Sequence, residues 1–212
     1  MKTVRDRRAS RWDAHRQARR VELTDAAILA IRTHGAGVGM DDVAAQAGTS
    51  KTVVYRHFAD RTELYVAVCA RVAEVLLAQV RAAMDGAEGP HAQTAAGIEA
   101  YLRLIEHDPE VYRFVVHRPL VDRSPGADPV ADLVSLVGDQ VAAVIATRTG
   151  DAATAVPWGH GIVGMVRAAA DNWLARGGRG DVTAMTRSQL AAHLTELAWA
   201  GLSGVTASKE DS

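Results

Sequence analysis

The stretch MDDVAAQAGTSKTVVYRHFADRTEL, residues 40–64, decides the fold of this chain. Its first part predicts a short helix, because Asp41 and Asp42 stand where acidic side chains favour a helix start. Gly48 is expected to end that helix, since glycine readily adopts the left-handed backbone found at helix ends. Ser50 can then cap a second short helix. Two short helices joined by a tight turn form a helix-turn-helix.

The second helix of this motif divides its side chains between a buried face and an exposed face. Val54 and Phe58, four residues apart, define the buried face. The exposed face is left with hydrogen-bond donors of the kind that contact phosphates and base edges, namely Lys51, Thr52, Tyr55, Arg56 and His57. This distribution favours a helix that reads double-stranded DNA.

The same stretch resembles the DNA-reading motif of TetR-family transcriptional regulators. The residues that carry the resemblance are Val43, Ala44, Ala47, Gly48, Ser50, Lys51, Tyr55, Arg56, His57, Phe58, Arg61 and Leu64. It implies an all-helical homodimer with an N-terminal DNA-binding domain and a C-terminal domain for a small-molecule effector. Such a protein would act on a DNA operator as a repressor.

The motif and the resemblance together give a set of candidate DNA-binding residues. We expect three of them to read bases and three to hold phosphates. The base-reading residues are Lys51, Thr52 and Arg56, and the phosphate contacts are Tyr55, His57 and Arg61. Ser50 and Val53 complete the set by their places in the motif.

Two departures from the family pattern leave a second interpretation open. Thr52-Val53 stands where the family usually has Gly-Thr, so a hydroxyl contact to DNA is missing at Val53. Gly39 takes the place of a threonine that usually contacts a phosphate. The alternative is therefore a helical module that binds a ligand or a protein and has lost operator reading.

Charge is distributed unevenly along the chain. Residues 1–61 hold 12 Lys and Arg against 7 Asp and Glu, a net charge of +5, whereas residues 62–212 hold 12 against 18, a net charge of −6. A basic end on an acidic body orients a protein towards DNA. Within the basic end, Arg16, Arg19 and Arg20 are expected to face the DNA backbone.

Helical periodicity recurs along the whole chain, which predicts an all-α protein of about nine helices. No alternation typical of strands and no internal repeat is visible. The expected organisation is a basic flexible arm over 1–14, a helix-turn-helix domain over 15–61, a ligand-binding and dimerisation domain over 62–205 and a disordered tail over 206–212.

Two late amphipathic helices, about 152–175 and 183–202, are candidates for a four-helix dimer interface. One carries small residues that allow close helix approach, and the other carries a leucine stripe. The candidate interface residues are Gly161, Gly164, Ala168, Leu190, Leu194 and Leu197. The alternative is an internal pair of core helices.

The C-terminal part also resembles, more loosely, actinobacterial regulators of fatty-acid and lipid metabolism. The similar segments are 104–109 with 112–114 after it, 161–165 and 198–202. The resemblance implies an elongated hydrophobic pocket for a lipid-like effector such as a fatty acyl-CoA. The expected lining is Tyr101, Ile105, Phe114, Leu136, Met165 and Trp173, although each of these residues could equally be ordinary core.

Other classes of protein find little support in the sequence. The single cysteine, Cys69, excludes an internal disulfide and fits a reducing cytoplasm. No signal peptide or membrane span is visible. The eight histidines are scattered without metal-ligand spacing, and no catalytic or cofactor-binding motif is present. We therefore expect neither an enzyme nor a metal or cofactor, but a soluble cytoplasmic regulator.

Overall fold

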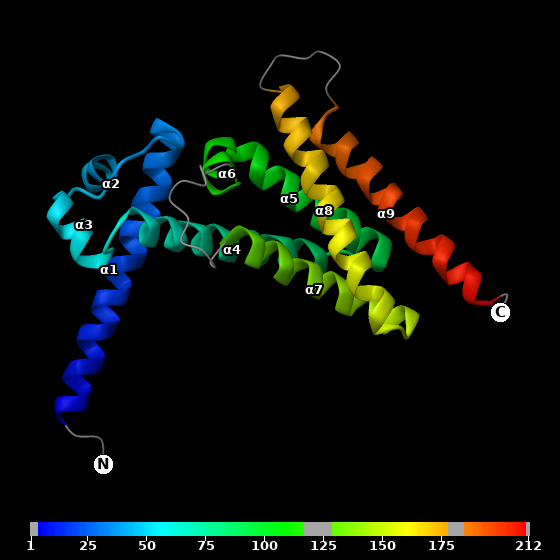
Figure 1. Ribbon diagram of the computed structural model, residues 1–212, viewed down its shortest axis with the longest axis horizontal. Helices are drawn as coiled ribbons and strands as arrows, with labels where there is room; N and C mark the ends of the chain where they lie inside the picture. The colour runs from blue at the N-terminus through cyan, green and yellow to red at the C-terminus, as the bar shows by residue number, and fades with distance from the viewer. Residues whose placement is uncertain (1–3, 117–128, 178–184, 211–212) are drawn as a thin grey trace. The chain divides into compact units, whose positions relative to one another are not determined.

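The computed structural model describes residues 4–116, 129–177 and 185–210. These residues form nine helices and no strand (Figure 1), which confirms the prediction of an all-α chain. The helices are α1 (Val4–His34), α2 (Met40–Gln46), α3 (Lys51–His57), α4 (Arg61–Asp85), α5 (Pro90–His107), α6 (Pro109–Val116), α7 (Pro129–Thr149), α8 (Ala152–Gly177) and α9 (Arg187–Glu210).

The two ends of the chain are more helical than the sequence indicated. α1 begins at Val4, within the expected flexible arm of residues 1–14, and α9 continues to Glu210, within the expected tail of 206–212. Neither segment contains glycine or proline, so nothing in their composition stops a helix that has already started.

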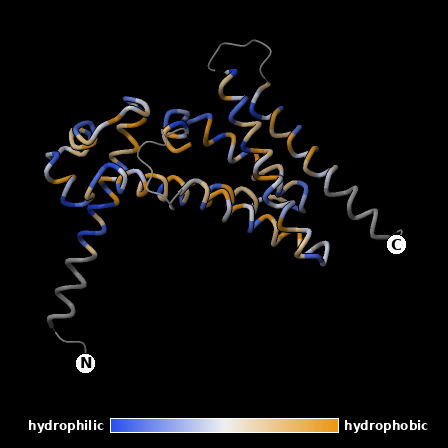
Figure 2. The backbone as a smooth tube through the Cα atoms, viewed as in Figure 1, coloured by the Kyte–Doolittle hydropathy of each residue, from blue (hydrophilic) through white to orange (hydrophobic). Residues whose placement is uncertain are grey.

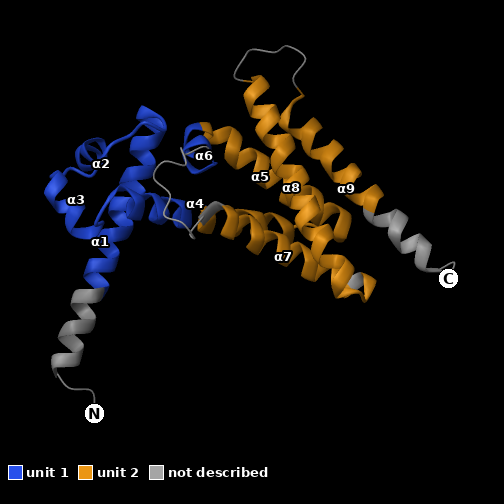
Figure 3. Ribbon diagram, in the orientation of Figure 1, with its two compact units in different colours: residues 1–72, 110–127 blue, residues 73–109, 128–212 orange. Residues whose placement is uncertain are grey.

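The chain divides into two compact units (Figure 3). The first comprises residues 1–72 and 110–127, and the second comprises 73–109 and 128–212. The boundary therefore falls inside α4, whereas the sequence analysis placed it at residue 61, before this helix. The structure moves it because the first turns of α4 bury their apolar side chains, which are Leu64, Tyr65, Val68 and Cys69.

The core of the first unit is built on one face of α1. Leu23, Ala27 and Ile31 follow helical spacing and are at most 1% exposed. Val43 of α2 and Val54 of α3 are fully buried as well. Hydrophobic and hydrophilic residues alternate along these helices (Figure 2), as expected where one face of each is buried.

α6 belongs to the first unit although it follows α5 directly in the chain. The Tyr65 hydroxyl of α4 donates a hydrogen bond of 2.9 Å to the carbonyl oxygen of Val115. The Tyr65 ring also packs against the Phe114 ring, with 5.6 Å between their centres. These contacts fix α6 on the start of α4.

In the second unit, α7 and α8 pack along each other at unusually close range. A Cβ atom at Gly159 would lie 2.5 Å from the backbone nitrogen of Ala142 and 2.5 Å from the carbonyl oxygen of Gly138. Only glycine fits there. Beside this crossing, His160 Nε2 lies 3.0 Å from Asp139 Oδ1.

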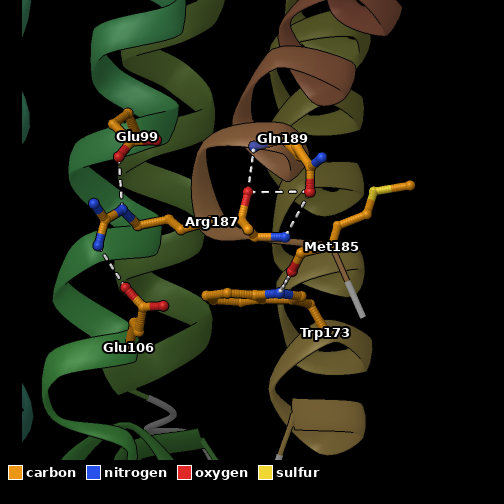
Figure 4. A network of polar contacts seen from close by, with 7 residues as sticks. Glu99, Glu106, Trp173, Met185, Arg187 and Gln189 are labelled. Atoms are coloured by element: carbon orange, nitrogen blue, oxygen red, sulfur yellow. Dashed lines mark hydrogen bonds and ion pairs between the residues drawn. The ribbon is translucent and has the colours of Figure 1, made fainter. Parts of the chain in front are cut away.

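α9 packs on α5, and a network of polar contacts holds its first turn in place (Figure 4). The Arg187 guanidinium bonds to the carboxylates of Glu99 (2.6 Å) and Glu106 (2.5 Å), two turns apart on α5. The Trp173 indole of α8 donates to the carbonyl oxygen of Met185 at 2.7 Å. The entry to α9 is therefore tied to both α5 and α8.

The structure divides the predicted dimer residues into two groups. Leu194 is only 5% exposed within the single chain, so its assignment to an intermolecular face was wrong. It lies with Ala191 and Ala198 on the buried side of α9, the helix that packs on α5. Leu190 is half-buried, whereas the other four predicted residues are exposed: Gly161, Gly164, Ala168 and Leu197.

Candidate nucleic-acid interface

The turn between α2 and α3 has the backbone that its sequence predicts. Gly48 has a φ of +60°, in the left-handed region. Ser50 occupies the N-cap position of α3 in an extended conformation, and its carbonyl oxygen accepts the N–H of Val53 at 2.9 Å. The Ser50 hydroxyl makes no capping bond, so it stays available on the exposed side of the turn.

α3 presents the predicted donors on its outer side. Lys51, Thr52, Tyr55 and Arg56 are exposed, while Val53 and His57 are half-buried. Val54 and Phe58 are fully buried beneath them. One short helix therefore carries a row of polar side chains on a fixed apolar base, which is the arrangement that reads a DNA groove.

Gly39 occupies the N-cap position of α2, where the family pattern has a threonine, and Asp42 in the first turn caps the helix in its stead. Asp42 Oδ2 accepts the backbone N–H of Gly39 at 2.7 Å, and glycine has no side chain to return the bond. The neighbouring Asp41 instead forms an ion pair with Lys51, with 2.7 Å between Oδ2 and Nζ.

Arg20 holds the other end of α3, a role that the sequence analysis missed. Its guanidinium donates to the carbonyl oxygen of His57, the last residue of the helix, and bonds to Glu63 Oε1 at 2.7 Å. It also lies 4.4 Å from the centre of the Phe58 ring. These contacts hold Arg20 within the first unit, against the end of α3. The available signal was its position three residues before Leu23, in line with the buried stripe of α1.

Arg61 is also engaged within the chain. Its guanidinium donates to the carbonyl oxygen of Val38, in the loop before α2, at 2.6 Å. The structure thus separates Arg61 from the row of donors on α3. Nearby, Glu63 accepts the backbone N–H of Ala59 at 2.6 Å, and this bond, followed by Arg20, lowers the pKa of the Glu63 carboxyl.

His57 lies in a positively charged environment. Burial lowers its pKa first, and the nearby charges of Arg16, Arg19, Arg20 and Arg56 lower it further. Its Nδ1 atom is buried and has no hydrogen-bond partner among the described residues. The end of α3 therefore concentrates arginines around an imidazole that stays neutral at pH 7.

The predicted effector residues fall in both units. Phe114 belongs to the first unit, where it lines a small cavity together with Ile31, Val43 and Tyr65. The other five belong to the second unit. Of these, Ile105 is buried and Leu136 is 47% exposed, while three are half-buried: Tyr101, Met165 and Trp173.

The described residues contain no group of three or more His, Cys, Asp or Glu side chains suited to bind a metal ion. None of their helices is long and apolar enough to cross a membrane.

Both halves of the chain match known protein families. Residues 23–68 match the family of bacterial regulatory proteins named tetR, and residues 79–212 match the tetracyclin repressor-like C-terminal domain. The uncharacterized HTH-type transcriptional regulator Rv0472c of Mycobacterium tuberculosis is 34% identical, over 94% of this chain and 84% of that protein. The HTH-type transcriptional activator FasR of Mycolicibacterium smegmatis is 30% identical, over 79% of this chain and 74% of that protein.

Solved structures show the same fold. A tetR-family regulator from Streptomyces coelicolor superimposes with a TM-score of 0.69 at 20% identity, covering 91% of this chain and 83% of that one. The fatty acid degradation regulator FadR from Bacillus halodurans superimposes with a TM-score of 0.65 at 14% identity, covering 84% of this chain and 93% of that one. With its helix-turn-helix and both family matches, this chain belongs to the TetR family of DNA-binding transcriptional regulators and is not an enzyme.

Proposed function

We propose that the protein is a homodimeric repressor that binds a two-fold symmetric DNA operator through α3 and is controlled by a hydrophobic effector. The observation that carries the DNA assignment is the row of exposed donors on α3: Lys51, Thr52, Tyr55 and Arg56. Buried Val54 and Phe58 fix this row to the first unit. The protein would work in the cytoplasm, where the DNA is.

The operator can be found by selection from a library of duplexes with a randomised centre, alongside the DNA that flanks the gene itself. We expect one motif with two half-sites about 34 Å apart, or a multiple of that spacing, because a two-fold dimer presents two recognition helices. If no motif is enriched and no duplex is bound, the alternative of a helical module that no longer reads DNA replaces this proposal.

The role of single residues is tested on the selected motif. Arg56→Ala should relax the preference at one base position, at a cost of about 1–3 kcal/mol if the contact is specific. Arg81→Ala is the matched control, because Arg81 is an exposed arginine of α4 outside the helix-turn-helix. Equal binding by both variants would contradict base reading by Arg56.

Two connections support coupling between the units. α4 contributes residues to both, and α6 of the first unit follows α5 of the second after the single residue Asp108. A shift of either helix on effector binding would therefore act on the first unit through the chain itself. An effector controls DNA affinity only if it binds one of the two geometries more tightly.

The proposed effector class rests on the resemblance to lipid regulators and on the set Tyr101, Ile105, Phe114, Leu136, Met165 and Trp173. Titration of long-chain acyl-CoAs against the operator complex tests it. Unchanged DNA affinity together with an unchanged melting temperature would remove the lipid claim and leave a regulator of another ligand.

The sign of regulation needs its own measurement, because FasR is named a transcriptional activator. We expect repression, so a reporter gene behind the selected operator should be expressed less when the protein is present. Higher expression in the presence of the protein would reverse the assignment.

A further inference from the structure

Asp41 and Lys51 form an ion pair across the turn of the helix-turn-helix. Asp41 is the second residue of α2, and Lys51 is the first residue of α3. Lys51 Nζ lies 2.7 Å from Asp41 Oδ2, although 49% and 74% of the two side chains are exposed. The hydrogen bond and the charge of Asp41 raise the pKa of the Lys51 ammonium. The lysine is thus fully charged but already has an acidic partner.

This pair competes with DNA for the same ammonium group. Under the proposed function, Lys51 binds a base edge on the operator or a phosphate on other sequences, and a contact that draws Nζ away from Asp41 breaks this ion pair. An exposed ion pair changes an equilibrium by roughly 1.5- to fivefold. A good base contact is worth roughly five- to 150-fold. Operator DNA can therefore displace Asp41 from Lys51, but breaking the ion pair lowers the affinity of the protein for the operator.

A helix-capping role accounts for Asp42 better than for Asp41. Acidic residues stabilise the first turn of a helix, but the backbone bond at the start of α2 is made by Asp42, which accepts the N–H of Gly39. Asp41 directs its carboxylate to Lys51 instead.

We propose that Asp41 is an intramolecular competitor for Lys51, an autoinhibitory contact that lowers the affinity of the recognition helix for DNA of any sequence. This inference rests on the proposed DNA-binding function. A lower affinity serves a regulator whose DNA complex must be opened by an effector, because the effector changes affinity only by a limited factor.

The test is a double-mutant cycle with Asp41→Asn and Lys51→Met on the full chain. Two probes are used, the duplex selected by the wild type and a random-sequence duplex of equal length. We expect Asp41→Asn to raise affinity for both duplexes by roughly 1.5- to fivefold per protomer, and to have no effect in the Lys51→Met background. Asp42→Asn is the matched control, since it removes the same charge one residue away while its amide oxygen can still accept the Gly39 N–H.

Each other outcome overturns the inference. Weaker operator binding by Asp41→Asn would make Asp41 a support or a base contact for DNA reading. If Asp41→Asn raises the DNA affinity equally in the Lys51→Met background, or if Asp42→Asn raises it as much, Asp41 acts only as a negative charge that repels DNA.

A measurement without DNA separates this inference from the proposed function. The pKa of the Lys51 ammonium, followed by NMR, should fall in Asp41→Asn. An unchanged pKa would show that the pair does not form in solution, even if the protein binds its operator. If the pKa falls but the wild type binds no duplex, the proposed function fails and the competitor role fails with it.

Discussion

Arg20 and Lys51 show how two side chains of the same charge take different roles by position alone. Arg20 bonds to the last carbonyl of α3 and to Glu63, and its guanidinium covers the buried Phe58 ring. Lys51 lies at the other end of the same helix, exposed and paired with an exposed aspartate. The first side chain holds the end of α3 in place, and the second is the one that we propose exchanges Asp41 for DNA.

Arg20→Ala should therefore weaken both folding and DNA binding. It removes a charged hydrogen bond and a cation–π contact, so we expect the free energy of unfolding to fall by about 1–3 kcal/mol. Arg20→Lys should recover little, because an ammonium cannot reproduce the guanidinium fork. Urea unfolding and operator binding are the measurements, with Arg81→Ala at an exposed position of α4 as the control. If both alanine variants behave alike, Arg20 is not a positioning residue.

His57 should make stability depend on pH. Its pKa is lowered from 6.5 in the folded state, so the unfolded chain takes up the proton first as pH falls through that value. The stability contributed by His57 is thus present above about pH 6.5 and is lost below it. Between pH 7.5 and 5.5 the wild type should lose more stability than His57→Gln. If chemical unfolding shows that the wild type and His57→Gln lose the same free energy of unfolding over this pH range, His57 does not cause the pH dependence.

At the scale of elements, short-range sequence patterns predicted the turn and the buried residues of the helix-turn-helix. They did not predict contacts between residues far apart in the chain. The turn at Gly48 and the buried pair Val54 and Phe58 follow from short-range spacing, and the structure has them as predicted. Arg20 and His57 are 37 residues apart, and no local pattern joins them. The burial of Leu194 depends likewise on α5, because a leucine stripe does not reveal whether its partner helix belongs to the same chain.

The crossing of α7 and α8 gives a prediction at this scale. Gly159→Ala would place a methyl group 2.5 Å from backbone atoms of α7, which cannot move aside as a side chain can. We expect a loss of about 1–3 kcal/mol in the free energy of unfolding. Gly201→Ala on α9 meets open space, so it should be neutral or slightly stabilising through helix propensity. Equal melting temperatures for the two variants would show that the crossing is looser than described.

At the scale of the whole molecule, the proposed dimer depends on faces that a single chain leaves uncovered. Gly161 and Gly164 of α8 are exposed, and a Cβ atom at either would meet nothing within 4 Å. Leu197 of α9 is 59% exposed, a large apolar side chain facing away from the core. A second copy of the chain would cover these residues and present two recognition helices to the operator.

Leu197 and Leu194 lie three residues apart on α9. Substitutions at these two positions distinguish a loss of dimerisation from a loss of folding. Leu197→Glu adds a charge to the exposed face, where burial against a partner is costly, so it should give a folded monomer that binds the selected operator poorly. Leu194→Glu places the same charge in the core beside α5, so it should unfold the second unit instead. Light scattering at micromolar concentration reports the mass, and circular dichroism reports the helix content. A wild type that is monomeric, or a dimeric Leu197→Glu, would rule out this face of α9 as the interface.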